Sequence, residues 1–452
     1  MVKISIITVF PELHEVFFKT SLLARAVEEK RIEINCVKLS DFVAPKQRID
    51  EPTCGPGAGM IIKPDIIQKA LEHCQHMWGD GYKIFFSPQG IVLNQKILQD
   101  YAHHIINAEE NKGSDSSLHV ADSVFTHLIL VCSRYEGLDE RVLDHYADCI
   151  LSIGDYVLMG GDIPAQVFIE GLTRLLPGIV GKKESVEHES FTGSFLDHPE
   201  YGLPIAWQGR KIPDIVLSGD HAKIEQWRKE QAAQKTMLSR FDWFRSSNPD
   251  QEAIALSKRV IPPHYGAIMH TQIVIKGGQI GESSVASLDI HDVARSARSY
   301  DLKNFFIVSP LTDQQEIIRT FIDFWMSEEG IAYNQSRHKA IERVISVESL
   351  QDVINVITEK EGKKPVLIAT SARKHENVPV IDYQSQGLVW SKDRPVLFLL
   401  GTGQGLSDQV LDQSDFILMP VQGLSDYNHL SVRSAAAVIF DRWFGLRPKK
   451  EQ

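Results

Sequence analysis

The sequence contains no apolar run long enough to cross a membrane as a helix. Such a helix needs about 20 predominantly apolar residues, and polar or charged residues interrupt every apolar stretch well before that length. The N-terminus, MVKISIITVF, lacks the longer apolar stretch and the small-residue cleavage site of a secretion signal, and Pro11-Glu12 ends it. We therefore expect no membrane anchor, and a buried first strand at the N-terminus.

Cysteine is scarce and lacks the spacing of a structural framework. The chain has five cysteines, an odd number, and no pair shows C-x-x-C spacing. These features argue against a zinc ribbon and against a set of structural disulfides. A reducing, cytoplasmic setting is the simpler expectation.

The sequence also lacks the basic excess that is typical of nucleic-acid-binding proteins. Its 48 Lys and Arg residues against 59 Asp and Glu residues give a net charge of −11. Neutralisation of phosphates supplies most of the non-specific affinity of proteins for RNA. An RNA site in this chain must therefore be a local basic patch or be assembled between chains.

Alternating strand and helix signals occur in two segments, from Val2 to about Gly181 and from about Met269 to Gly445. Between them, a polar loop precedes a stretch whose apolar spacing predicts a helix over residues 221–244. Pro262-Pro263 cannot continue a helix, so we place the start of the second segment near residue 265.

The two segments have similar patterns. After an apolar strand, residues 137–144 and 405–412 share the sequence Gly-Leu-x-x-x-Val-Leu-Asp. KIFFSPQG (83–90) and NFFIVSPL (304–311) each resemble a buried strand that ends in Ser-Pro, and we pair them as equivalents. A duplicated α/β domain is the economical interpretation. The alternative is that doubly wound sheets in general share such turn residues between strands and helices.

Two glycine-containing loops are candidates for ligand binding. GTGQGL (401–406) fails as a nicotinamide-cofactor fingerprint, because its sixth position is Leu406 and it lies late in its segment. In GDYVLMGGD (154–162), three glycines bracket residues that could wrap a flat ligand, and Pro164 then begins a helix. A purely structural turn is the alternative. The nearby ionisable candidates are Arg134, Glu136, Asp139, Glu140, Arg141, Arg174, Glu187, His188, Glu189 and Asp197.

Residues 1–245 resemble the bacterial tRNA (guanine-N1)-methyltransferases of the TrmD family, which belong to the SPOUT class. The resemblance rests on many motifs in one order. They include ITVFPEL (7–13), SPQG (87–90), SRYEGLDERV (133–142), SIGDYVLMGGDIPA (152–165), ESFTGSFLDHPEY (189–201) and VLSGDHAKIEQWR (216–228).

This resemblance implies a trefoil-knotted fold, an obligate homodimer with interfacial active sites, and methyl transfer from S-adenosylmethionine to N1 of the guanine next to the tRNA anticodon. Glu136 and Arg174 match residues that hold this guanine, and Glu189 matches the base that takes the N1 proton. His188 is the alternative base. The positions that match the cofactor loops are Phe86, Ser87, Pro88, Ser133, Glu136, Gly137, Ser152, Ile153, Gly154, Asp155, Tyr156, Val157, Leu158, Gly160, Gly161 and Pro164.

The sequence departs from the family pattern at three places, one of which is the stretch from Asp41-Phe42 to Lys46, where the usual charged pattern varies. Glu189 stands where the family has Asp and is one methylene longer, which puts the rate in doubt. PTCGPGAGM (52–60) carries an extra residue and a proline in a turn that is glycine-rich in the family. Dependence on Mg²⁺ is implied by the family alone, because we predict no metal site from the spacing of potential ligands.

Residues 268–447 resemble a group of SPOUT-type RNA methyltransferases of uncertain substrate, through SLDIHDVARSARSYDLKNFFIVSPL (287–311) and SDYNHLSVRSAAAVIFDR (425–442). The order of motifs also resembles ribose 2′-O-methyltransferases of this class, in which an early-helix arginine acts near the hydroxyl. Arg295 matches that residue, with Arg298 one turn along, and plain surface charge is the alternative. The positions that match a second cofactor pocket are Gly401, Met419, Asn428, Leu430, Ser431 and Val432.

We therefore predict an α/β protein with two trefoil-knotted SPOUT domains (1–181 and 268–447), joined by a loop (182–195) and a small helical tRNA-binding domain (196–262). One alternative is that the second domain has lost its chemistry and adds only RNA or dimer contacts; cofactor stoichiometry distinguishes the two. A nucleotide-binding α/β protein unrelated to RNA remains a third interpretation if the resemblance is set aside.

Overall fold

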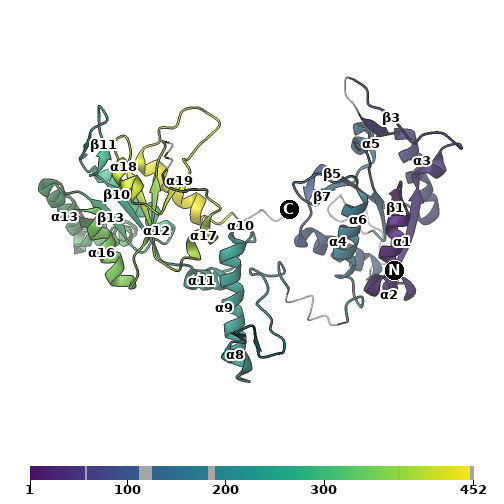
Figure 1. Ribbon diagram of the computed structural model, residues 1–452, viewed down its shortest axis with the longest axis horizontal. Coiled ribbons are helices and arrows are strands. Elements are labelled where there is room, and N and C mark those ends of the chain that lie inside the picture. Colours follow the sequence, from purple (N-terminus) through teal and green to yellow (C-terminus); the bar gives the residue numbers. More distant parts are fainter. Residues whose placement is uncertain (56–58, 111–124, 182–188, 374, 376, 448–452) are drawn as a thin grey trace. The chain divides into compact units, whose positions relative to one another are not determined.

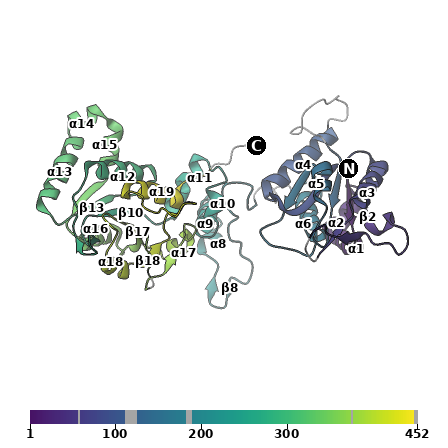
Figure 2. The ribbon, with the colours of Figure 1, turned by 90° about the horizontal axis from the view of Figure 1, so that it is seen from above.

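The chain forms two structural units, Met1–Gly193 and Ser194–Gln452, seen in two views in Figures 1 and 2. No helix among the described residues is long and apolar enough to cross a bilayer. The computed structural model describes residues 1–55, 59–110, 125–181, 189–373, 375 and 377–447.

A five-stranded parallel sheet forms the centre of the first unit, in the spatial order β2-β1-β6-β5-β7. Its middle strand, β6, has the sequence HLILV and is buried throughout, as expected where helices cover both faces of a sheet. The strands are β1 (Val2–Thr8), β2 (Ile32–Lys38), β5 (Tyr82–Val92), β6 (His127–Val131) and β7 (Cys149–Ser152).

Helices cover both faces of this sheet. Phe18, Leu23, Tyr101 and Phe168 belong to the core on one face. That face is covered by α1 (Glu12–Phe18), α2 (Ser21–Glu28), α4 (Gln95–Glu110) and α6 (Asp162–Thr173). The other face is covered by α3 (Pro64–Trp78) and α5 (Glu140–Tyr146). A 3₁₀ turn (Leu39–Phe42) and a two-stranded ribbon of β3 (Asp50–Pro52) and β4 (Met60–Ile62) follow β2.

The second unit contains a seven-stranded parallel sheet in the order β14-β13-β10-β17-β15-β18-β16. A small ribbon of β11 (Ile273–Val274) and β12 (Ile280–Gly281) lies outside it. The strands of the sheet are β10 (His264–Met269), β13 (Phe305–Val308), β14 (Val344–Val347), β15 (Val366–Thr370), β16 (Val380–Ile381), β17 (Val396–Gly401) and β18 (Phe416–Leu418).

Helices again form two layers. One face of the sheet is covered by α12 (Ser287–Ser299), α13 (Thr312–Met326), α15 (Gln335–Ile341), α17 (Gln386–Trp390) and α19 (Val432–Phe444). The other face is covered by α16 (Leu350–Glu361) and α18 (Asp408–Asp412), while α14 (Glu328–Tyr333) follows α13. Ser349 and Asp352 form a capping box at the start of α16, and Gly362 ends that helix in the left-handed conformation.

A helical segment, residues 194–262, belongs to the second unit. It contains the hairpin of β8 (Ala206–Trp207) and β9 (Arg210–Lys211), then α8 (Asp214–Leu217), α9 (His221–Ser239), α10 (Phe241–Phe244) and α11 (Gln251–Val260). The helix predicted over 221–244 is interrupted at Arg240, whose backbone φ is −143°. Phe241 and Phe244 can thereby turn into the core of the second unit.

The two sheets share one strand order. In chain order, the strands β1, β2, β5, β6 and β7 of the first unit occupy the same places as β10, β13, β15, β17 and β18 of the second. This supports the predicted duplication, with β14 and β16 added at the two edges of the second sheet. The predicted equivalence of residues 83–90 and 304–311 is wrong, because β5 corresponds to β15 and β13 corresponds to β2. A Ser-Pro sequence at the end of a strand reports only local conformation, whereas the position of a strand in the sheet depends on which strands it pairs with.

Candidate functional site

The first candidate site is a pocket at the carboxyl edge of the first sheet, where ligands bind in open α/β folds. Its lining comes from the irregular part of β5, at Phe86, Ser87 and Pro88, and from the ends of β6 and β7 with the loops that follow them. It encloses about 260 Å³. The lining residues are Phe86, Ser87, Pro88, Ser133, Arg134, Tyr135, Glu136, Gly137, Leu151, Ser152, Ile153, Gly154, Tyr156, Val157, Leu158, Gly160, Gly161 and Pro164.

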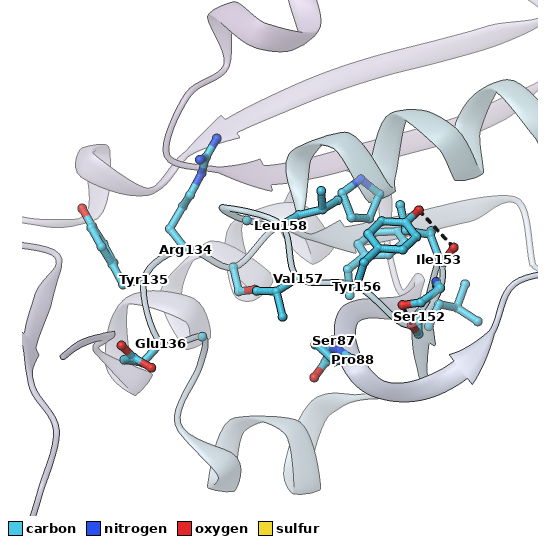
Figure 3. A pocket seen from close by; sticks show the side chains of 18 residues that line it. Ser87, Pro88, Arg134, Tyr135, Glu136, Ser152, Ile153, Tyr156, Val157 and Leu158 are labelled. Carbon is cyan, nitrogen blue, oxygen red and sulfur yellow. Dashed lines mark hydrogen bonds between the residues drawn. The ribbon is translucent and has the colours of Figure 1, made fainter. Parts of the chain in front are cut away.

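All the positions predicted to bind a cofactor in this half lie in the pocket lining except Asp155. Figure 3 shows Tyr135 and Glu136 on one side of the pocket and Tyr156 with Ile153 on the other. The Tyr156 hydroxyl donates a hydrogen bond to the Ile153 carbonyl at 3.2 Å. Leu151 also lines the pocket, although the sequence prediction began the third cofactor loop one residue later, at Ser152.

Two glycines let the pocket loops approach each other. A Cβ atom on Gly161 would lie 2.9 Å from the Cα of Cys132, and one on Gly160 would lie 2.7 Å from the Ser133 carbonyl oxygen. The Gly161 amide donates to that same carbonyl at 2.8 Å. Any side chain at these positions would therefore separate the β6 loop from the β7 loop.

A buried carboxylate joins the pocket loop to the rest of the first unit. Asp162, in the first turn of α6, is 1% exposed. It accepts hydrogen bonds from Thr8 and from the Arg134 Nε at 3.0 Å, and its other close neighbour is His14 Nε2 at 3.1 Å. Burial by itself would raise the pKa of Asp162, but hydrogen bonds from His14 and Thr8 and the charge of Arg134 outweigh it and lower that pKa. Arg134 also donates to the Met159 carbonyl at 3.4 Å, so Asp162 orients an arginine that holds the loop.

The same cluster is a poor metal site. In the described part of the chain, His14, Cys132 and Asp162 place potential ligand atoms within 4.8 Å of one another. However, burial raises the pKa of the Cys132 thiol well above its usual value, which disfavours the thiolate that binds metals. Both carboxylate oxygens of Asp162 are already engaged. Mg²⁺, which prefers an octahedron of oxygen ligands, does not fit these residues.

The predicted catalytic pair of the first half lies away from the pocket. Arg174 follows α6 and forms a two-pronged ion pair with Glu189, through Nη1 at 2.6 Å and through Nη2. The hydrogen bond to Glu189 raises the pKa of Arg174. Neither residue lines the pocket. At about 1.5 Å per residue, Arg174 lies roughly 15 Å along α6 from Pro164. His188, the alternative base, lies outside the described residues.

The second candidate site is a pocket of about 670 Å³ at the carboxyl edge of the second sheet. It is lined by the loops after β15, β17 and β18 and by the start of α19. All six positions predicted from the sequence line it: Gly401, Met419, Asn428, Leu430, Ser431 and Val432. Other lining residues with polar side chains are Thr370, Ser371, Arg373, Tyr383, Gln404 and His429.

Arg295 is not brought to this pocket. It is an exposed residue of α12, and its charge, with that of Arg337, contributes to a lowered pKa of His291, which is mainly an effect of burial. Arg298 lies 3.8 Å from Asp301 in an exposed ion pair. Both positions are thus compatible with the surface-charge alternative, and the pocket lining contains neither.

A polar network missed by the sequence prediction lies beside the second pocket. Arg433, next to the lining residue Val432, forms ion pairs with Asp289 and Asp292 of α12, each at 3.3 Å. Buried His270 contacts the Ser283 hydroxyl at 3.0 Å, and burial lowers the pKa of His270. No local pattern marks these residues, because they are brought together from distant parts of the chain.

The two pockets are equivalent in position. The strands β5, β6 and β7 that contain or precede the lining segments of the first pocket correspond in the shared order to β15, β17 and β18, which precede the loops of the second. Gly401 ends β17, the counterpart of β6, and a Cβ atom there would lie 2.6 Å from the Leu406 amide nitrogen in the loop that follows. A pocket thus occurs at the same place in both sheets.

Comparison with known proteins assigns each part to a described family. Residues 2–246 match the model of "tRNA (Guanine-1)-methyltransferase TrmD", and residues 264–445 match that of "SAM-dependent RNA methyltransferase". A tRNA (guanine-N(1)-)-methyltransferase of Oleidesulfovibrio alaskensis is 31% identical over 98% of this chain and 99% of its own length. One of Nitratidesulfovibrio vulgaris is 32% identical over the same shares. One of Thermotoga petrophila is 40% identical over 55% of this chain and 93% of its own length.

Proposed function

The chain belongs to the TrmD family of tRNA (guanine-N1)-methyltransferases, and we propose on that basis that it methylates N1 of the guanine next to the tRNA anticodon. It is an S-adenosylmethionine-dependent enzyme, and its second half belongs to a family of RNA methyltransferases that use the same cofactor. One observation carries the proposal for the first unit. Three segments that are far apart in sequence converge on one pocket and bring the predicted cofactor residues together.

The pocket residues suit S-adenosylmethionine, whose methyl group is carried on a positively charged sulfur. Gly160 and Gly161 let the β7 loop pack closely on the β6 loop in the pocket wall, and Leu151, Val157 and Leu158 offer apolar contacts to a flat adenine. Glu136 places a negative charge on the side of the pocket opposite Tyr156 (Figure 3). We also propose that the segments lining each pocket form the trefoil knot of the SPOUT class.

Glu189 is the base in this proposal. Its carboxylate accepts the proton from guanine N1 while the N1 lone pair forms the new bond to the methyl carbon and the carbon–sulfur bond breaks. Arg174 pairs with Glu189 in the structure, and in the proposal it donates to the guanine O6, where negative charge develops as N1 loses its proton. Most of the rate increase comes from holding N1 and the methyl group in contact.

The active site of this proposal is completed by a second copy of the chain. Arg174, at the far end of α6, lies too far from the pocket to meet a methyl group bound there in its own chain, and Glu189 pairs with it. An apolar surface supports pairing of two chains: Val157 and Met159 are each 87% exposed and Val16 is 71% exposed. Phe10, Leu13, Ile163 and Val167 are further exposed apolar residues of α1, α6 and their flanking loops, and the Gln166 side chain joins the two helices through the Leu13 carbonyl at 2.9 Å.

Mixing two inactive variants tests this shared site. Gly161→Ala disables the pocket, Glu189→Gln disables the base, and a mixed dimer contains one intact composite site. Statistical pairing predicts recovery of about a quarter of the wild-type rate. Activity no higher than the sum of the separate variants would show that pocket and base act within one chain, and a monomeric active enzyme in sedimentation would also contradict the dimer.

The second unit is proposed as an active methyltransferase that acts on a ribose 2′-hydroxyl. The equivalence of its pocket with the first supports cofactor binding there. The alternative is a second domain that only binds RNA or mediates dimer contacts. The domain division predicted from the sequence remains part of the proposal. A role for Mg²⁺ would require a site other than the His14–Cys132–Asp162 cluster.

Cofactor stoichiometry and product mapping separate these possibilities. Calorimetry on wild-type protein is expected to give two binding sites per chain, and Gly161→Ala and Gly401→Ala are each expected to remove a different one. Mass mapping of nucleosides from unmodified tRNA is expected to reveal N1-methylguanosine next to the anticodon. An added ribose methyl that disappears in Gly401→Ala would support the second activity, whereas a single cofactor site would leave the second unit as a binding module.

A further inference from the structure

The family boundary and the structural boundary of this chain do not coincide. The match to the tRNA methyltransferase family extends to residue 246, but the first structural unit ends at Gly193. Residues 194–246 therefore lie within the match to the tRNA (guanine-N1)-methyltransferase family, but they pack as part of the second structural unit.

Arg245 anchors this segment to the second sheet. Its side chain is buried and donates to three backbone carbonyls at the end of α19: Gly445 at 2.6 Å, Arg442 at 2.7 Å and Asp441 at 2.9 Å. The last carbonyls of a helix have no partner within the helix, so a guanidinium is well suited to this end. Burial lowers the pKa of Arg245 to about 10, which leaves the group charged at neutral pH.

Apolar packing continues the same contact. Met237, Phe241 and Phe244 of α9 and α10 share one core with Trp390 and Trp443 of the second sheet's helices. The rings of Phe241 and Trp390 meet edge to face at 4.9 Å. Gly387 lies so close to α9 that a Cβ atom there would be 1.9 Å from the Leu238 carbonyl oxygen.

The helix held by Arg245 is also the helix that reaches the second pocket. Val432, Ala435 and Ile439 of α19 line that pocket. α19 has 13 residues, a length of roughly 20 Å at about 1.5 Å per residue. The helix α19 thus connects the second pocket to residues 194–246.

The outer end of the segment has side chains suited to RNA. The β8–β9 hairpin exposes Trp207, 59% accessible, together with the exposed basic residues Arg210 and Lys211. An aromatic ring can stack on an unpaired base, and basic side chains contact phosphates. This local combination is compatible with RNA binding despite the net charge of −11.

We infer that the second methyltransferase domain also acts on tRNA, and that residues 194–262 hold the same class of RNA for both active sites. The inference depends on the proposed function, because it requires that each pocket supports methyl transfer. It assigns to the second domain a substrate class that its family description leaves at RNA in general.

The first test uses full-length Gly161→Ala protein, in which only the second pocket is intact, with radiolabelled S-adenosylmethionine. Transcribed tRNA and transcribed ribosomal RNA are compared as acceptors. We expect label in tRNA, none in ribosomal RNA, and none with the Gly161→Ala, Gly401→Ala double variant. Label only in ribosomal RNA would overturn the inference but keep two activities. Cofactor binding without label in either RNA would overturn the proposed second activity itself.

The second test asks whether the segment serves both sites. The Trp207→Ala, Arg210→Ala double variant is expected to raise the KM for tRNA about tenfold for both methyl transfers, as expected for loss of a stacked base and a phosphate contact. Its matched control, Tyr333→Ala with Lys339→Ala, removes an exposed aromatic and an exposed basic residue elsewhere in the same unit. The control should leave both KM values unchanged. An effect on guanine methylation alone would exclude a shared RNA-binding segment.

Discussion

In both units a polar side chain connects two particular helices, but this side chain is an acid in the first unit and a base in the second. In each, the helix after the third pocket loop is tied to the first helix of its sheet. The first unit uses a buried acid, Asp162 of α6, facing His14 of α1, and the second uses a base, Arg433 of α19, facing Asp289 and Asp292 of α12. Both units therefore join these two helices through polar side chains, but the chemistry of the contact differs between the units.

Burial distinguishes the two ties. The Asp162 side chain is 1% exposed and its partner Arg134 is 18% exposed, whereas Arg433 is 34% exposed. Buried ion pairs cost much more to break than surface pairs. The first pocket is also the smaller, at about 260 Å³ against about 670 Å³. We therefore expect substitutions at comparable positions to have different effects on the activity and the stability of the two units.

The largest expected difference between the units follows from Glu189→Gln. The amide keeps the shape of the side chain but cannot take the N1 proton, so guanine methylation should fall by about 10²- to 10⁴-fold. Label transfer by the second unit should be unaffected. The matched control is Glu170→Gln, an exposed carboxylate one turn before Arg174 on the same helix. A Glu189→Gln enzyme with wild-type turnover would exclude Glu189 as the base.

The ties between helices should differ in their contribution to stability. Asp162→Asn leaves Arg134 without its carboxylate and is expected to destabilise the first unit by about 3–5 kcal/mol. Arg433→Gln should cost the second unit no more than about 1 kcal/mol. Denaturant unfolding, followed separately for the two units, measures both values. Equal effects would mean that burial does not govern these ties.

Acid should destabilise the second unit. Burial lowers the pKa of His264 in the second unit to about 3, while an unfolded histidine titrates near about 6.5. The unfolded state therefore binds the proton first, and the stability of the second unit should fall as the pH drops from about 6.5 towards 3. In the first unit, the stabilisation that comes with the lowered pKa of Asp162 is lost below about pH 4. Burial also lowers the pKa of His127 in that unit, so its contribution falls as the pH drops below about 6.5.

Tryptophan fluorescence can follow this acid effect, because of the seven tryptophans only Trp78 lies in the first unit. Thermal melts at a series of pH values should show fluorescence midpoints that fall from about pH 6 downwards. Midpoints for the second unit that stay constant between about pH 6.5 and pH 4 would contradict a buried neutral His264.

The features that the sequence pattern predicted correctly are those that depend on a few neighbouring residues. Glycine-rich strings such as residues 154–161 mark loops that require glycine backbone, and the apolar runs of β6 and β17 mark buried strands. The predicted cofactor positions of both halves therefore gather at two pockets, with only Asp155 outside the lining. The family resemblance added the roles of these positions, which the sequence pattern alone did not contain.

Contacts between distant segments were decided only by the tertiary structure. The sequence did not indicate that Asp162 meets His14, that β5 corresponds to β15, or that Arg295 lies away from the second pocket. It also did not indicate that Arg245 joins a segment of the first family to the second sheet. Periodicity and turn residues report the conformation of a few neighbouring residues, whereas these contacts depend on which surfaces pack together once the whole chain is folded.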